Sequence, residues 1–203
     1  MSTARIDKVV VPGVFSLDGQ DFDVENNVWL VGDDDEVLVI DAPHDAAPIV
    51  AAVGGRRVTA IVLTHGHNDH ITAAVALREA TGAPVWFNPD DRMLWDVVHP
   101  DTGPDRELTE GTTFDVAGTT LTALSTPGHS PGSTCLHAPD LGTVFTGDTL
   151  FCGGPGATGR SYSDHPTIVE SIRTRLLTLP PDTVVRTGHG DDTTIAAEVG
   201  NVS

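Results

Sequence analysis

The stretch that decides the fold is Thr59–Ala60–Ile61–Val62–Leu63–Thr64–His65–Gly66–His67–Asn68–Asp69–His70. It opens with a continuous, mostly apolar run, which is typical of a strand buried on both faces. In an extended loop, side chains at positions i, i+2 and i+4 point the same way. We therefore expect His65, His67 and Asp69 to converge, while His70 turns into the helix that follows. Imidazole and carboxylate groups suit Zn²⁺ or iron, so the stretch predicts a metal site.

Three further candidate ligands share one local pattern, because each follows an apparent strand and lies beside glycine. They are His129 in Pro127–Gly128–His129, Asp148 in Gly147–Asp148 and His189 in Gly188–His189–Gly190. Glycine permits tight turns and close approach of the backbone, so each side chain can reach a shared centre at a strand end. The sequence thus predicts one site assembled from distant segments.

The remaining pattern predicts an α/β (α+β) protein. Strands are expected at residues 9–11, 27–31, 37–41, 59–63, 84–87, 112–116, 120–124, 133–137, 143–146 and 183–187. Helices are expected over residues 44–53, 71–81, 166–177 and 195–199, and the acidic run 33–36 is expected to form a hairpin turn. Strand blocks joined to helices in each half predict two packed sheets with helices outside, in a single domain over residues 1–203.

Composition narrows the classes of partner. The 203 residues include 11 basic and 29 acidic ones, a formal net charge of −18, which repels phosphate backbones and disfavours nucleic acid. No apolar run reaches the roughly 20 residues that span a bilayer, and no signal peptide is recognised, so no membrane contact is expected. With two cysteines, a disulfide framework is not indicated, and a cytoplasmic location is expected. We expect a small-molecule substrate and a monomer or homodimer.

These motifs resemble those of the metallo-β-lactamase superfamily and, within it, the glyoxalase II-like hydrolases. The resemblance covers nearly the whole chain, from Val39–Ile40–Asp41 to Thr193–Thr194–Ile195. It implies a four-layer αββα sandwich. It also implies His65, His67 and His129 on a first metal and Asp69, His70 and His189 on a second, with Asp148 bridging both. Asp69 and Asp148 are then the candidate catalytic residues, and Zn²⁺, two per chain, is the expected metal, with iron or manganese as alternatives.

The resemblance implies hydrolysis of a small thioester or ester. Two dications can acidify a shared water and polarise a carbonyl. Thiols have a pKa of about 8.5, so a thiolate leaves without a general acid, and a thioester suits a site with no evident proton donor. The glyoxalase II region that binds glutathione has no counterpart after His189, and the glycine-rich segment after Phe151 offers one basic residue, Arg160. A thiol carrier other than glutathione is therefore expected.

Three of four further candidate residues outside the ligand set have two interpretations each. Arg160 is a candidate to hold a substrate carboxylate, with a surface ion pair as the alternative. Tyr162 is a candidate to line the same pocket, with packing favoured. Cys152 is expected to be a buried structural thiol near the site. Asp41 either orients a ligand histidine or ends a strand. His44, His99, His137 and His165 are expected to be structural or surface residues.

Two competing functions remain open from the sequence. A mono-iron persulfide dioxygenase of the same superfamily would use the ligands corresponding to His65, His129 and Asp148, all present here. The Gly188–His189–Gly190 ending favours the hydrolase. A metal-binding scaffold that has lost catalysis is disfavoured because all seven ligand positions are filled.

Overall fold

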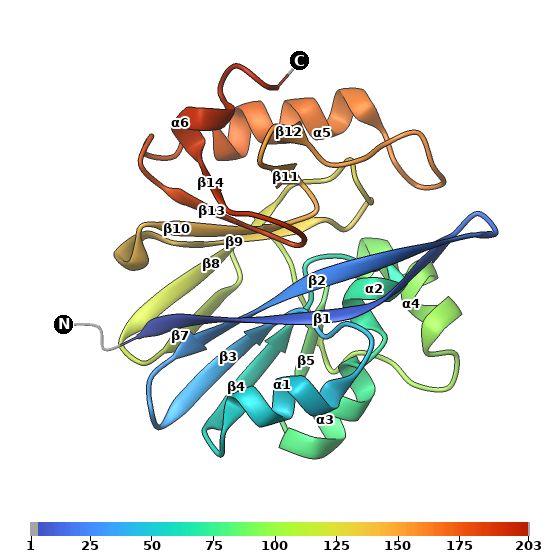
Figure 1. The fold of residues 1–203 in the computed structure, drawn as a ribbon, viewed down its shortest axis with the longest axis vertical. Helices are drawn as coiled ribbons and strands as arrows, with labels where there is room; N and C mark the ends of the chain where they lie inside the picture. Colours follow the sequence, from blue (N-terminus) through green and yellow to red (C-terminus); the bar gives the residue numbers. More distant parts are fainter. Residues whose placement is uncertain (1–3, 203) are drawn as a thin grey trace.

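Two six-stranded sheets stack face to face in the computed structural model, which describes residues 4–202 (Figure 1). The first sheet runs β1-β2-β3-β4-β5-β6, with bounds Arg5–Leu17, Gln20–Gly32, Glu36–Ile40, Arg57–Val62, Val85–Phe87 and Arg106–Glu107. The second runs β14-β13-β10-β9-β8-β7, with bounds Thr193–Thr194, Val184–Thr187, Thr143–Gly147, Thr134–Ala138, Thr119–Ser125 and Thr113–Val116. A separate small pair is formed by β11 (Leu150–Phe151) and β12 (Gly154–Pro155).

Helices cover the outer face of each sheet, which confirms the predicted αββα layering (Figure 1). Beside the first sheet lie α1 (Ala46–Val53), α2 (Asn68–Ile71), α3 (Ala74–Thr81) and α4 (Arg92–Val98). Beside the second lie α5 (His165–Ser171), which continues as a π-helical turn over Ile172–Leu176, and α6 (Ile195–Glu198). Short 3₁₀ turns occur at Pro89–Asp91 and Pro139–Leu141.

Three apolar clusters fill the spaces between the four layers. Along β2, Val28 and Leu30 belong to the cluster under α1 and α3, whereas Trp29 and Val31 belong to the cluster between the sheets. This alternation follows from the two-residue period of a strand, and it shows that β2 is buried on both faces. The third cluster joins the second sheet to α5.

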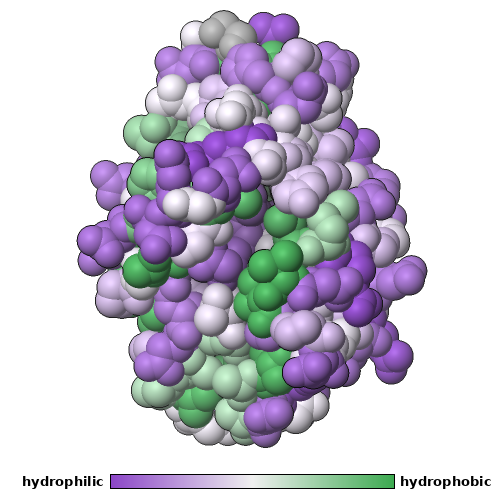
Figure 2. All heavy atoms as spheres, turned by 90° about the vertical axis from the view of Figure 1, so that its right-hand side faces the viewer, coloured by the Kyte–Doolittle hydropathy of each residue, from purple (hydrophilic) through white to green (hydrophobic). Residues whose placement is uncertain are grey.

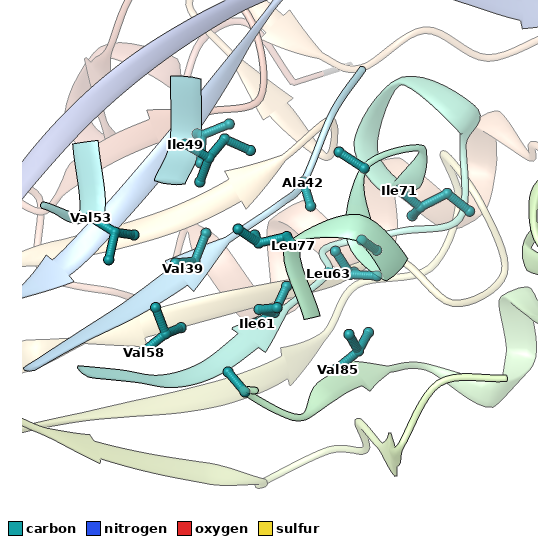
Figure 3. Close-up of a cluster of buried hydrophobic side chains, with 14 of the residues drawn as sticks. Val39, Ala42, Ile49, Val53, Val58, Ile61, Leu63, Ile71, Leu77 and Val85 are labelled. Carbon is teal, nitrogen blue, oxygen red and sulfur yellow. The ribbon is translucent and has the colours of Figure 1, made fainter. Parts of the chain in front are cut away.

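The cluster under α1 and α3 anchors the segment that carries the predicted ligands. Figure 3 shows Leu77 of α3 beside Ile61 and Leu63, which flank the end of β4. Leu63 and Ile71 are both fully buried, and the predicted ligand run lies between them in the sequence. Packing on either side therefore fixes the position of the ligand loop.

The first two strands are far longer than predicted. Both β1 and β2 have 13 residues, and they form an antiparallel hairpin paired from Arg5↔Gly32 to Leu17↔Gln20. Asp18 and Gly19 make the turn with φ of 54° and 72°, the left-handed conformations that two-residue hairpin turns need. The prediction stopped early because Pro12 and Gly13 interrupt the pattern of β1 and because the outer half of β2, residues 20–25, is largely exposed, so neither stretch has the signal of a core strand.

The predicted helix over residues 71–81 is interrupted. Helix α2 ends at Ile71 and α3 begins at Ala74. At the break, Ala42 N donates to His70 O at 2.9 Å, and Ala73 N donates to Ala42 O at 2.8 Å. Ala42, which follows β3, thus bonds with backbone groups that a continuous helix would have paired internally. These bonds hold the ligand segment against the first sheet.

Hydrophilic residues dominate the face shown in Figure 2, where a short band of apolar residues runs along the middle. In the part of the chain that the structure describes, no helix combines the length and apolar character needed to cross a bilayer.

Replacing Leu77 by Ala should destabilise the fold by about 2–5 kcal/mol, because it leaves a cavity in a packed core. Val97→Ala is the matched control, since Val97 is 81% exposed and its loss should cost no more than about 0.5 kcal/mol. Urea denaturation of both variants checks the difference. Equal stabilities would contradict this packing.

Candidate metal centre

Each predicted ligand follows the end of a strand, and the strand ends meet along one edge of the sandwich. His65 and His67 follow β4, and α2 begins directly after them. Asp148 follows β10 and His189 follows β13, two strands that pair in parallel. Thr134 N donates to Thr64 O at 2.9 Å, which links the second sheet to the ligand loop. Parallel strands deliver their carboxyl ends to the same edge, so distant residues are brought together.

The first group of ligands consists of His65, His67 and His129. His67 Nδ1 lies 3.0 Å from His65 Nε2 and 3.0 Å from His129 Nε2. Zinc–nitrogen bonds of about 2.0–2.1 Å in tetrahedral geometry put ligand atoms about 3.3 Å apart. The spacing therefore fits three nitrogens around one metal ion.

The second group consists of Asp69, His70 and His189. His189 Nε2 lies 3.2 Å from Asp69 Oδ2 and 3.3 Å from His70 Nε2, and the remaining pair, His70 Nε2 and Asp69 Oδ2, is 3.6 Å apart. These separations match a second cation site of mixed nitrogen and oxygen donors.

Asp148 lies between the two groups. Its Oδ2 is 3.7 Å from His129 Nε2 and 3.4 Å from His189 Nε2, and its Oδ1 is 3.3 Å from His70 Nε2. One carboxylate thus faces both groups, which is the placement that a bridging ligand needs. Gly188 makes this possible, because a Cβ there would come within 2.2 Å of Asp148 Oδ1.

Contacts on the outer ring nitrogens orient three of the imidazoles. His70 Nδ1 donates to Asp41 Oδ2 at 2.8 Å, His129 Nδ1 to Ala157 O at 2.9 Å and His189 Nδ1 to Glu25 O at 2.8 Å. Each acceptor can only accept, so in the neutral ring Nε2 presents a lone pair to the centre. The predicted contact of Asp41 with a ligand histidine is therefore present.

Unpaired buried atoms show that the donor set fits a cation. Asp69 Oδ1 is buried without a hydrogen-bond partner, and Asp148 Oδ1 has none apart from its 3.3 Å contact with His70 Nε2. Leaving buried carboxylate oxygens unpaired is costly. Divalent metal ions among these oxygens and lone pairs would offset that cost.

The protonation of the two groups differs. Burial lowers the pKa of His65 well below its usual value and lowers the pKa of His67 to about 3, so these rings stay neutral. Burial also opposes protonation of His70 and His189, yet the carboxylates, Asp148 first, raise the pKa of His70 well above its usual value and that of His189 to about 10. The second group therefore attracts positive charge, either as protons or as a metal ion.

A family model described as the metallo-beta-lactamase superfamily matches residues 22–189, a span that contains all seven predicted ligands. The chain belongs to this superfamily. Among curated members, the hydroxyacylglutathione hydrolase GloC of Haemophilus influenzae is 32% identical over 190 residues, covering 86% of this chain and 90% of that protein.

Two solved structures extend the comparison with the superfamily. The crystal structure of TTHA1623 in a di-iron-bound form has 31% identity and a TM-score of 0.77, covering 94% of this chain and 98% of that one. ETHE1 from Myxococcus xanthus has 27% identity and a TM-score of 0.71, covering 93% and 80%.

A cleft of about 920 Å³ opens over the centre, beneath the β1–β2 hairpin. His67, Asp69, His129, Asp148 and His189 all line it. The candidate substrate residues Arg160 and Tyr162 do not. Instead, Arg160 Nη1 donates to Gln20 Oε1 at 3.1 Å and its guanidinium lies over the Phe22 ring, while Tyr162 is 53% exposed. A role for either residue in substrate binding stays a prediction.

The expectation that Cys152 is a buried thiol is wrong. Cys152 is exposed, in the tight turn between β11 and β12, where Gly153 and Gly154 both have positive φ. The turn directs the residue outward, whereas Phe151 before it lines the cleft. Cys135 is buried as predicted, and burial raises the pKa of its thiol to about 11.

Sequence reasoning missed two contacts around the second group. Asn26 is fully buried, and its Nδ2 donates to Asp69 Oδ2 at 3.0 Å. His44 Nε2 contacts Asn26 Oδ1 at 2.8 Å and so orients the amide. The signal was the pair Asn26–Asn27 at the start of an apolar strand, since an amide inside a sheet needs a specific partner.

Asp91 joins the two loops that carry the first group, and the sequence did not reveal it. Its buried carboxylate accepts from Gly66 N at 2.8 Å, from Gly132 N at 2.6 Å and from Ser130 Oγ at 2.6 Å. Gly66 separates His65 from His67, and Ser130 follows His129. One carboxylate therefore sets the distance between the two loops.

Asp91→Asn should weaken binding at the first group by about 10–100-fold, because an amide nitrogen would face one of the three donors and release a loop. Competition with a coloured chelator measures the metal affinity. Asp90→Asn is the matched control, since the neighbouring Asp90 is exposed. An Asp91→Asn protein that binds metal as tightly as this control would contradict the positioning role.

Proposed function

We propose that this protein is a two-metal hydrolase that cleaves a small thioester or ester. The observation that carries the proposal is the pair of three-residue groups with Asp148 between them, both open to one cleft. The name of the similar Haemophilus influenzae protein, a hydroxyacylglutathione hydrolase, supports thioester chemistry. The di-iron form of a second similar protein supports a centre of two metal ions.

His65, His67 and His129 would hold the first metal, and Asp69, His70 and His189 the second. Bound divalent cations would supply a water that ionises near neutral pH and would polarise the scissile carbonyl. The protein's own residues position these events. Asp148 faces both groups and would set the separation between the cations, while its orientation depends on the close approach of Gly188.

Asp69 is the candidate to handle the proton of the attacking water. Its Oδ2 is held by Asn26 and contacts His189, while its Oδ1 is buried and has no hydrogen-bond partner. A carboxylate fixed by one oxygen and free at the other can accept a proton in a defined place. The leaving thiolate needs no proton donor, because thiols ionise near pH 8.5. Zn²⁺ is the proposed native metal, with iron or manganese as alternatives that the same ligands accept.

A persulfide dioxygenase is the alternative, and it would need only His65, His129 and Asp148 on one iron. The second group argues for the hydrolase. In a mono-iron dioxygenase, Asp69, His70 and His189 would have no metal to bind, although their lone pairs face one another. The two functions therefore differ in how much they depend on His189.

His189→Ala distinguishes the two functions. The hydrolase should lose its second metal ion and about 100-fold or more in thioester kcat, because the paired centre is broken. A mono-iron dioxygenase would keep its metal and its oxygen uptake. Metal analysis, thiol release from a neutral thioester and oxygen consumption with a persulfide are measured together on both proteins. Asp140→Asn, an exposed site, is the control. Oxygen uptake that survives in His189→Ala would overturn the hydrolase.

A further inference from the structure

The cleft above the metal centre has apolar walls. Val14 and Phe15 of β1, Val24 of β2 and Phe151 of β11 line it. The Phe15 ring lies 5.2 Å from the ring of His67, so an apolar surface begins directly at the first ligand group. Such walls favour hydrocarbon groups next to the reacting bond.

The charged lining of the cleft is entirely acidic once the seven ligands are set aside. Asp23 and Glu25 of β2 are the two charged residues that remain, and no lysine or arginine among residues 4–202 lines the space. Positions i and i+2 of a strand share one face, so the two carboxylates reinforce each other. Their potential extends over the substrate path because the cleft walls are of low polarity.

The cationic residues around the cleft are already engaged. Lys8 Nζ donates to Gly190 O at 2.9 Å and lies over the Trp29 ring. Arg160 packs on Phe22 and donates to Gln20. Hydrogen bonds from Ser161, and to a smaller extent the charge of Arg160, lower the pKa of Asp18. Neither residue lines the cleft.

Building on the proposed hydrolase, we propose that this cleft selects thioesters whose thiol half is neutral or positively charged and that Asp23 and Glu25 reject carboxylate-bearing thiols such as glutathione. The reaction is that of the proposed function: water adds to the acyl carbon, the carbon–sulfur bond breaks, and a carboxylic acid and a thiol are released. Selection acts on the charge of the thiol half of the substrate, which must lie along Asp23 and Glu25 of β2. The apolar walls of the cleft accept the rest of the substrate.

A charge series with one acyl group tests this selection. The acetyl thioesters of thiocholine, N-acetylcysteamine and 3-mercaptopropionate carry charges of about +1, 0 and −1 near pH 7, by the usual ionisation of these groups. The metal-loaded protein should show kcat/KM for the cationic ester about tenfold or more above that for the anionic ester. The ratio should fall as salt rises from about 0.01 to 1 M, because screening shortens the reach of the carboxylates.

The double variant Asp23→Asn/Glu25→Gln should bring the cation-to-anion ratio close to one, by raising kcat/KM for the anionic ester. Glu79→Gln/Asp90→Asn is the matched control, because it removes the same net charge from exposed sites outside the cleft. This control should keep the ratio of the wild type. The corresponding S-ethyl thioethers cannot be hydrolysed. Their binding affinities, measured by calorimetry, should follow the same order: cationic, then neutral, then anionic.

The outcomes separate the two proposals. If no thioester is hydrolysed but the thioethers bind in the order cation, neutral, anion, the proposed function fails and the selectivity stands. If the esters are hydrolysed with no preference or with the anion preferred, or if the double variant behaves like its control, the selectivity is overturned and the hydrolase stands.

Discussion

Five imidazoles and two carboxylates meet at one edge of this molecule, largely out of contact with water, and their lone pairs point toward common centres. Such an arrangement is unfavourable by itself, because buried acceptors without donors lose the hydrogen bonds that water would provide. Bound cations make the same arrangement favourable, because the carboxylates and the imidazole lone pairs then bind metal. The hairpin, the strand ends and the loop glycines all serve to hold these seven groups in that costly arrangement.

Three buried polar residues outside the ligand set help to hold the seven ligands in place. Asp41 ties the end of β3 to Thr64 and His70. Asp91 fixes the two loops of the first group to each other, and Asn26 holds Asp69 from the opposite side. Each link crosses between segments that are distant in sequence, so the centre depends on the tertiary structure as a whole rather than on one local motif.

The seven ligands and the layers of the fold could be predicted from the sequence, for physical reasons. The apolar run before His65 marks a strand buried on both faces, and glycine beside His129, Asp148 and His189 marks tight turns at strand ends. The layering of the fold could be predicted from the blocks of strands and from the helices that join them. The full length of β1 and β2 could not be predicted, because Pro12 and Gly13 interrupt β1, the outer half of β2 is largely exposed, and the pairing of the two strands with each other is what extends them.

The supporting residues were harder to predict. Asp91 lies in a short 3₁₀ turn and its sequence context resembles that of any acid at a helix start, so its three hydrogen bonds depend on loops elsewhere in the chain. The exposure of Cys152 depends on the two glycines that follow it. Distant loops determine the role of Asp91, whereas the tight turn after Cys152 determines the exposure of its thiol, and hydrophobic periodicity carries no information about either.

A crystal structure of the metal-loaded protein, with anomalous data collected at the absorption edge of the metal, tests most directly whether the seven side chains enclose two metal ions. We expect two peaks, one among His65, His67 and His129 and one among Asp69, His70 and His189, with Asp148 between them. A single peak, or metal bound away from these residues, would contradict it.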